Sequence, residues 1–100
     1  MQAIVTVKEG RAHIRLQGRF DFNAHREFRE AIDTVLAGPA TVVAVDFAGV
    51  EYLDSSALGM LLMLRDRAKS AAREVTLANC RGAVKQILDI ANFGKLFKIE

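Results

Sequence analysis

A nearly apolar run from Thr41 to Phe47 is the feature that most restricts how this chain can fold. A run this short cannot cross a bilayer, and it is typical of a strand that lies deep in a sheet or is covered on both faces. A helical pattern follows from Ala57 to Ala72, after a short polar segment. A buried strand that leads into a helix predicts a crossover to a further parallel strand, and therefore an α/β fold.

An antiparallel hairpin is expected before this unit. The strand-like runs Gln2 to Lys8 and Arg11 to Gly18 are joined by the turn dipeptide Glu9-Gly10. Apolar and polar residues alternate in the second run, which predicts a buried face made by Ala12, Ile14 and Leu16. A helix is expected next, with Asn23 as its N-cap and Gly38-Pro39 as its stop.

The rest of the chain continues the alternation. A short strand is expected over Val75 to Asn79, a helix over Gly82 to Ala91, and a last short strand between Leu96 and Ile99. The predicted order is ββαβαβαβ: a mixed β-sheet that begins with the antiparallel hairpin and goes on with parallel strands, and about three helices. A chain of 100 residues, 51% of them hydrophobic, has material for one compact core, so a single domain over residues 1–100 is expected.

Charge and cysteine content exclude several classes of function. The net charge is only +2 and the basic and acidic side chains are interspersed, which argues against a nucleic-acid surface. The lone Cys80 cannot form an internal disulfide, and no Cys-x-x-Cys or His-rich pair predicts a metal site. The start of the chain lacks the pattern of a signal peptide. A cytoplasmic protein without membrane insertion, metal or cofactor is therefore expected.

The polar trio Asp54-Ser55-Ser56 stands where the central strand gives way to the second helix. The first N–H groups of a helix lack intrahelical partners and the helix dipole favours negative charge there, so this is a favourable place for a phosphate. Phosphorylation of Ser55 would add about −2 of charge and three acceptor oxygens. The simpler interpretation is that Asp54 or Ser55 only caps the helix.

The second helix also offers a candidate docking surface. Its expected core face consists of Ala57, Leu61, Leu64, Ala68, Ala71 and Ala72. Leu58, Leu62 and Met63 fall outside that face, on the side that later becomes charged, which suits a partner's surface. The alternatives are that another element covers these side chains, or that the core face is wide at this end.

Three segments resemble the STAS domain, specifically the bacterial anti-sigma factor antagonists. The order Asp54-Ser55-Ser56-Ala57-Leu58-Gly59, after a strand and Tyr52, is similar to the signature of that family. The segment from Gly18 to Ala24 resembles the family's connection between its second strand and first helix, and Ile87 to Phe97 resembles its closing segment. The likeness covers nearly the whole chain. Ala57 departs from the glycine that the family often has at this position.

The resemblance assigns roles to the residues around the second helix start. It implies that Ser55 is the phosphorylated residue, with Asp54, Ser56 and Asp21 supporting the phosphorylation site. The helical projection makes Leu58, Leu62 and Met63 the expected partner-binding residues, and Gly59 joins them because it permits close backbone approach, as in the family pattern. Glycine inside a helix lowers the stability of the helix by about 1 kcal/mol relative to alanine. A compensating gain in packing or docking is therefore expected at Gly59.

The implied function is that of an anti-sigma factor antagonist. The unphosphorylated form would bind an anti-sigma factor that is also a serine kinase, and so release a sigma factor; a metal-dependent serine phosphatase would reverse the phosphorylation. The alternative is a STAS-type docking subunit, either of a stress-signalling assembly or of a membrane transporter for anions or lipids. No His-Ser-Asp arrangement or phosphate-binding glycine loop is present, so an enzyme is not expected.

Overall fold

A computed structural model describes residues 1–100. Its main elements are β1 (Gln2–Lys8), β2 (Arg11–Phe20), α1 (His25–Ala37), β3 (Val42–Leu53), α2 (Ser55–Ser70), β4 (Glu74–Ala78), α3 (Gly82–Ile90) and β5 (Lys98–Ile99). Two short 3₁₀ helices, η1 (Phe22–Ala24) and η2 (Phe93–Lys95), precede α1 and β5. The predicted element order is confirmed.

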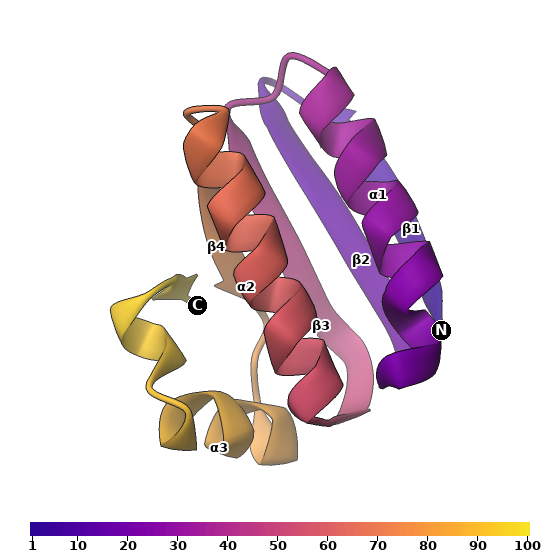
Figure 1. Cartoon of the computed structure of the whole chain (residues 1–100), viewed down its shortest axis with the longest axis vertical. Coiled ribbons are helices and arrows are strands. Elements are labelled where there is room, and N and C mark those ends of the chain that lie inside the picture. The colour runs from indigo at the N-terminus through magenta and orange to yellow at the C-terminus, as the bar shows by residue number, and fades with distance from the viewer.

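The strands form one sheet in the order β1-β2-β3-β4-β5. β1 and β2 are antiparallel and all other neighbours are parallel, as predicted. Each parallel crossover steps to the next strand in the same direction, so right-handed connections place the helices on one face of the sheet. In Figure 1, α1 and α2 lie side by side in front of the sheet and α3 lies near one end. The opposite face of the sheet is left without a helix.

The hairpin between β1 and β2 turns at Glu9 and Gly10, which both have positive φ (53° and 76°). Positive φ at both central residues defines a type I′ turn, whose twist matches that of the flanking strands. The register then runs without interruption from Lys8–Arg11 to Gln2–Gln17. The hairpin predicted from the sequence is therefore confirmed.

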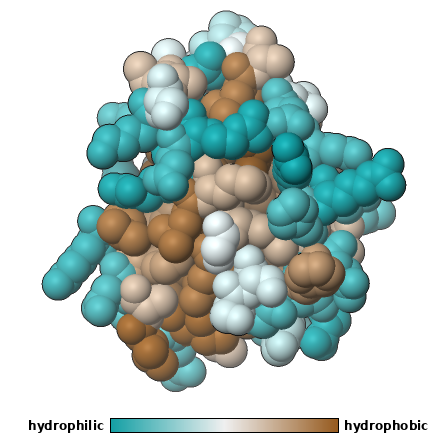
Figure 2. Space-filling view, in the orientation of Figure 1, coloured by the Kyte–Doolittle hydropathy of each residue, from teal (hydrophilic) through white to brown (hydrophobic).

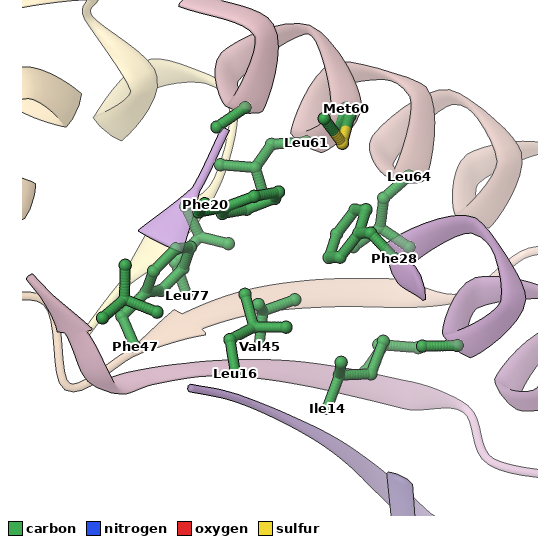
Figure 3. Close-up of a cluster of buried hydrophobic side chains, with 14 of the residues drawn as sticks. Ile14, Leu16, Phe20, Phe28, Val45, Phe47, Met60, Leu61, Leu64 and Leu77 are labelled. Carbon is green, nitrogen blue, oxygen red and sulfur yellow. The ribbon is translucent and has the colours of Figure 1, made fainter. Parts of the chain in front are cut away.

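The core lies between the helices and the helix-facing side of the sheet. Figure 3 shows Leu61 and Leu64 of α2 directed towards Phe20 and Phe28, with side chains of β2 and β3 beneath them. The Phe20 and Phe28 ring centroids are 5.0 Å apart. Ala12, Ile14 and Leu16 are fully buried, as the alternation in β2 predicts.

The start of the first helix differs from the prediction. Asp21, rather than Asn23, is the capping residue: its Oδ1 accepts a hydrogen bond from the Asn23 backbone N–H at 3.0 Å. This bond starts η1, and α1 follows from His25. β2 runs on to Phe20, so the chain enters helical conformation immediately after it and the first available carboxylate takes the cap.

The end of α2 also differs. Ala57, Leu61, Leu64 and Ala68 are buried as expected, and Met60, which was not predicted, is buried with them. The helix ends at Ser70, and Ala71 and Ala72 are exposed rather than part of the core. Ala72 has φ 58°, and the Arg73 N–H donates to the Ala68 carbonyl at 2.8 Å, as in a Schellman motif.

β3 is longer than the predicted strand and continues to Leu53. The extension passes through a register shift opposite β2, after which Gln17 pairs with Gly49. A Cβ at Gly49 would lie 2.8 Å from the Leu16 carbonyl oxygen, so only glycine fits this close approach. The extension carries the chain to the end of β2, where the candidate site lies. No helix of the structure is both long and apolar enough to cross a membrane.

Candidate functional site

Two aspartates follow two neighbouring strands at the same edge of the sheet. Phe20 and Leu53 are register partners at the carboxyl ends of β2 and β3, and Asp21 and Asp54 come next. The Asp54 N–H donates to the Phe20 carbonyl at 3.3 Å, which ties the two strand ends together. Each aspartate has an extended backbone and begins a helical segment. The topology therefore brings together Asp21 and the Asp54-Ser55-Ser56 trio.

Asp54 is the N-cap of α2. Its Oδ1 accepts a hydrogen bond from the Ala57 backbone N–H at 3.1 Å. Ser55 is the first residue of the helix and is exposed, whereas Ser56 is half-buried. The sequence allowed either Asp54 or Ser55 to cap the helix. Asp54 is the cap, so the Ser55 side chain is not used for capping. An exposed hydroxyl thus stands at the positive end of a long helix.

Asp21 forms an ion pair with Arg19, a residue that was not predicted to belong to the site. Arg19 Nε lies 3.6 Å from Asp21 Oδ2, and the Arg19 guanidinium stacks over the Tyr52 ring at 4.1 Å from its centroid. Arg19 and Tyr52 are register partners on β2 and β3. The strand predicted from the sequence ends at Gly18, which leaves Arg19 in the connection to the first helix. Continuing the alternation by two residues would have placed it on the strand.

The exposed stripe of α2 begins with Ser55, Gly59 and Leu62 and continues to Asp66 and Lys69. Spacings of four and three residues place these positions on one face of a helix. Leu62 is 37% exposed to solvent. A Cβ added at Gly59 would meet no atom within 4 Å. Leu58 and Met63, by contrast, are half-buried and pack against the core. Of the four predicted docking residues, Gly59 and Leu62 are therefore exposed, whereas Leu58 and Met63 are partly buried.

A further exposed aromatic residue lies at this edge. Phe22 of η1 is 73% exposed, and η1 packs against α2. In Figure 2 the half of the helical face over the start of α2 is largely brown, tan or white, whereas hydrophilic side chains dominate the other half. Phe22 was not among the predicted site residues. Its position directly after the capping Asp21 is the feature of the sequence that could have indicated an aromatic residue at this edge.

The titratable groups do not assemble into a metal centre. No group of three or more His, Cys, Asp or Glu side chains is placed to hold a metal ion. Cys80 is buried, and desolvation raises its pKa from 9.0 to about 11. At neutral pH it is a protonated thiol and a poor nucleophile. The edge at the carboxyl ends of β2 and β3 therefore carries an exposed serine hydroxyl, two capping carboxylates and a partly apolar surface.

Comparison with known proteins identifies the family. The family model described as "Mlab, STAS domain" matches residues 5–99, so the chain belongs to this family of STAS domains. A STAS-domain containing protein of Pseudomonas aeruginosa (strain UCBPP-PA14) is 54% identical over 86 residues, which cover 86% of this chain and 84% of the relative. The resemblance to the STAS domain stated from the sequence is confirmed.

Solved structures share the fold at low sequence identity. The anti-sigma factor antagonist SpoIIAA in its unphosphorylated form is 23% identical, with a TM-score of 0.76 over 98% of this chain and 86% of that one. A putative anti-sigma factor antagonist from Thermotoga maritima is 16% identical, with a TM-score of 0.87 over 97% and 84%. A sulfate transporter family protein from Wolinella succinogenes is 14% identical, with a TM-score of 0.79 over 94% and 79%. The predicted mixed sheet with three helices is thus the fold of this group.

Proposed function

We propose that this STAS domain is a protein-binding switch controlled by phosphorylation of Ser55. The observation that carries the proposal is the division of roles at the start of α2: Asp54 caps the helix while Ser55 stays exposed. A phosphoryl group on Ser55 gains from the helix dipole without displacing the cap. The modification therefore changes the surface and leaves the core as it is.

Gly59 and Leu62 support a docking role for the same face. An exposed glycine within a helix costs about 1 kcal/mol relative to alanine. Nothing in the chain occupies the space that a Gly59 side chain would take, so intramolecular packing does not account for the glycine. Close approach of a partner one helical turn after Ser55 does account for it. The exposed side chains of Leu62 and Phe22 then supply apolar contact area.

The partner we propose is an anti-sigma factor that is also a serine kinase. The support is the sequence resemblance together with structural neighbours that are anti-sigma factor antagonists, among them SpoIIAA in unphosphorylated and phosphorylated forms. In this scheme the unphosphorylated chain binds the anti-sigma factor and releases a sigma factor. The kinase phosphorylates Ser55, and a metal-dependent serine phosphatase restores the binding form.

The physical basis of the switch is local electrostatics and desolvation. A phosphate on Ser55 adds negative charge to an edge that already carries Asp21 and Asp54, beside the apolar Leu62. A partner that presents carboxylates or apolar surface meets repulsion or a desolvation cost there. A loss of about 2–3 kcal/mol weakens binding roughly 30- to 150-fold, which is sufficient for a switch.

Phosphopeptide mapping of the protein from its native cells tests the proposal. We expect a phosphate on Ser55 that disappears in Ser55→Ala and persists in Ser56→Ala, the matched variant one residue on. A phosphatase should remove it and restore partner binding. Absence of phosphate across growth and stress conditions, with Ser55→Ala equal to wild type in partner binding, would contradict the switch.

The second candidate is a constitutive docking subunit of a membrane transporter. The observation in its favour is the fold shared with the sulfate transporter family protein of Wolinella succinogenes. Such a subunit binds its partner regardless of the state of Ser55. Ser55→Asp distinguishes the two: it weakens partner binding in a switch and leaves the binding of a constitutive subunit unchanged.

A further inference from the structure

The sheet face without helices carries a polar hollow of about 270 Å³ that the proposed switch does not use. Its lining comes from three adjacent strands: Ile4 and Thr6 of β1, His13 and Arg15 of β2, and Asp46 of β3. The start of α2 and its exposed stripe belong to the helical face on the other side of the sheet (Figure 1). The two surfaces are therefore separate.

The strand register explains why these side chains meet. Arg15 lies opposite Ile4 on one side and Asp46 on the other. His13 lies opposite Thr6 and Ala44 in the same way. Directly opposed residues of neighbouring strands point to the same face, so a guanidinium, an imidazole, a hydroxyl and a carboxylate project together. Ala44, which is short and 1% exposed, leaves room between the longer side chains.

Asp46 is fixed in place. Its Oδ1 accepts hydrogen bonds from the Ala48 backbone N–H and from Asn79 Nδ2, both at 2.9 Å. Asn79 adopts a left-handed backbone conformation, with φ 56°, at the end of β4. Both bonds fall on one oxygen, which leaves Oδ2 available to a ligand. The carboxylate is thus pre-oriented without being neutralised.

Arg15 is the arginine on this face of β2 that has no ion-pair partner. Arg11 pairs with Glu100 at 3.7 Å and Arg19 with Asp21 at 3.6 Å, all on or beside the same face of β2. Arg15 faces Asp46 in register but takes part in none of the ion pairs of the structure. A cation and a carboxylate that face each other across a hollow without pairing form a dipolar site.

We propose that this hollow binds a small zwitterion of the α-amino acid class. The ligand carboxylate would bind to Arg15, with His13 and Thr6 as further donors, and its ammonium group to Asp46 Oδ2. A simple anion meets repulsion from Asp46, and a simple cation meets repulsion from Arg15, so opposite charges on one ligand suit the hollow best. Ile4 supplies an apolar wall for the ligand's side chain. Because the hollow is open to water, a dissociation constant of about 1 mM is expected.

An NMR titration of the full chain with L-alanine tests this proposal. Acetate and methylammonium serve as matched probes that each carry one of the two charges. We expect L-alanine to shift the backbone amide signals around Arg15 and Asp46, and the single-charge probes to shift them much less. No shifts with L-alanine up to about 50 mM, or equal shifts with acetate, would overturn the proposal.

Three variants assign the binding to this hollow. Arg15→Gln and Asp46→Asn should each weaken L-alanine binding by roughly tenfold, the effect of losing one charged contact. Asn retains the oxygen that accepts from Ala48 and Asn79, so the second variant keeps the local structure. Arg11→Gln, on the same face of β2, should bind as wild type. Equal affinity in all three variants would place the binding elsewhere and contradict the proposal, whatever the state of Ser55.

Discussion

Gly59 stands in the second turn of α2, where an alanine side chain would project into open space. At most positions a residue's effect on stability and its effect on binding are hard to separate. Here we expect opposite signs, because the methyl group that improves helix propensity would also occupy the open space that the proposed partner approaches. This single position therefore tests whether the exposed stripe of α2 is a docking surface.

Gly59→Ala should raise the free energy of unfolding by about 0.5–1 kcal/mol, since alanine loses less backbone entropy in a helix. The same change should weaken partner binding, because the partner can no longer approach the helix backbone closely. Urea denaturation and a direct binding assay measure the two effects. Ser70→Ala, at the far end of the same helix, is the control and should leave binding unchanged. Unchanged binding in Gly59→Ala would remove Gly59 from the docking surface.

At the scale of elements, the helix ends were harder to predict than the helices themselves. Apolar spacing gave the buried side of α2 from Ala57 to Ala68, because burial depends on the helical period. The spacing contains no stop signal at Ala72, where the Schellman motif places an alanine in the left-handed conformation that glycine usually occupies. Asp21 was similarly missed as a cap, because the length of β2 decides which polar residue reaches that position.

Ala72→Gly should stabilise the protein. A left-handed alanine is strained by roughly 1–2 kcal/mol, and part of that gain is offset by the greater freedom of glycine in the unfolded chain. A net increase of about 1 kcal/mol, or roughly 4–8 °C in Tm, is expected in thermal unfolding. Ala71→Gly is the matched control: φ is −96° there, so glycine relieves no strain and Tm should not rise. A rise in both variants would contradict the assigned cause.

At the scale of the whole molecule, the sequence predicted the topology and the place of Ser55 at the start of α2, but not the polar hollow. Strand and helix alternation determines the order of elements, and the carboxyl ends of β2 and β3 then meet at one edge. The hollow depends instead on register: Arg15 faces Asp46 only because β2 pairs with β3 in this alignment. Residues so far apart in sequence carry no local signal of being neighbours.

Cys80 couples the stability of the whole molecule to pH. It is 8% exposed, between β4 and α3, and burial raises its pKa from 9.0 to about 11, with Lys85 opposing part of the rise. Between these values the folded chain retains a proton that the unfolded chain has lost, so the free energy of unfolding should fall as pH rises from about 9 to about 11. Below about pH 9 this contribution is constant, because the thiol is protonated in both states.

Urea denaturation from about pH 8 to about pH 11 measures this dependence. The informative quantity is the difference in slope between wild type and Cys80→Ala, because the groups that the two proteins share contribute equally to both slopes. The variant lowers stability at every pH by its loss of packing, but that offset does not change with pH and leaves the slope comparison intact. We expect the wild type to lose stability more steeply above pH 9 than the variant. Parallel curves would mean that the thiol ionises as readily in the folded chain as in the unfolded one, and that Cys80 is less shielded from water than its burial indicates.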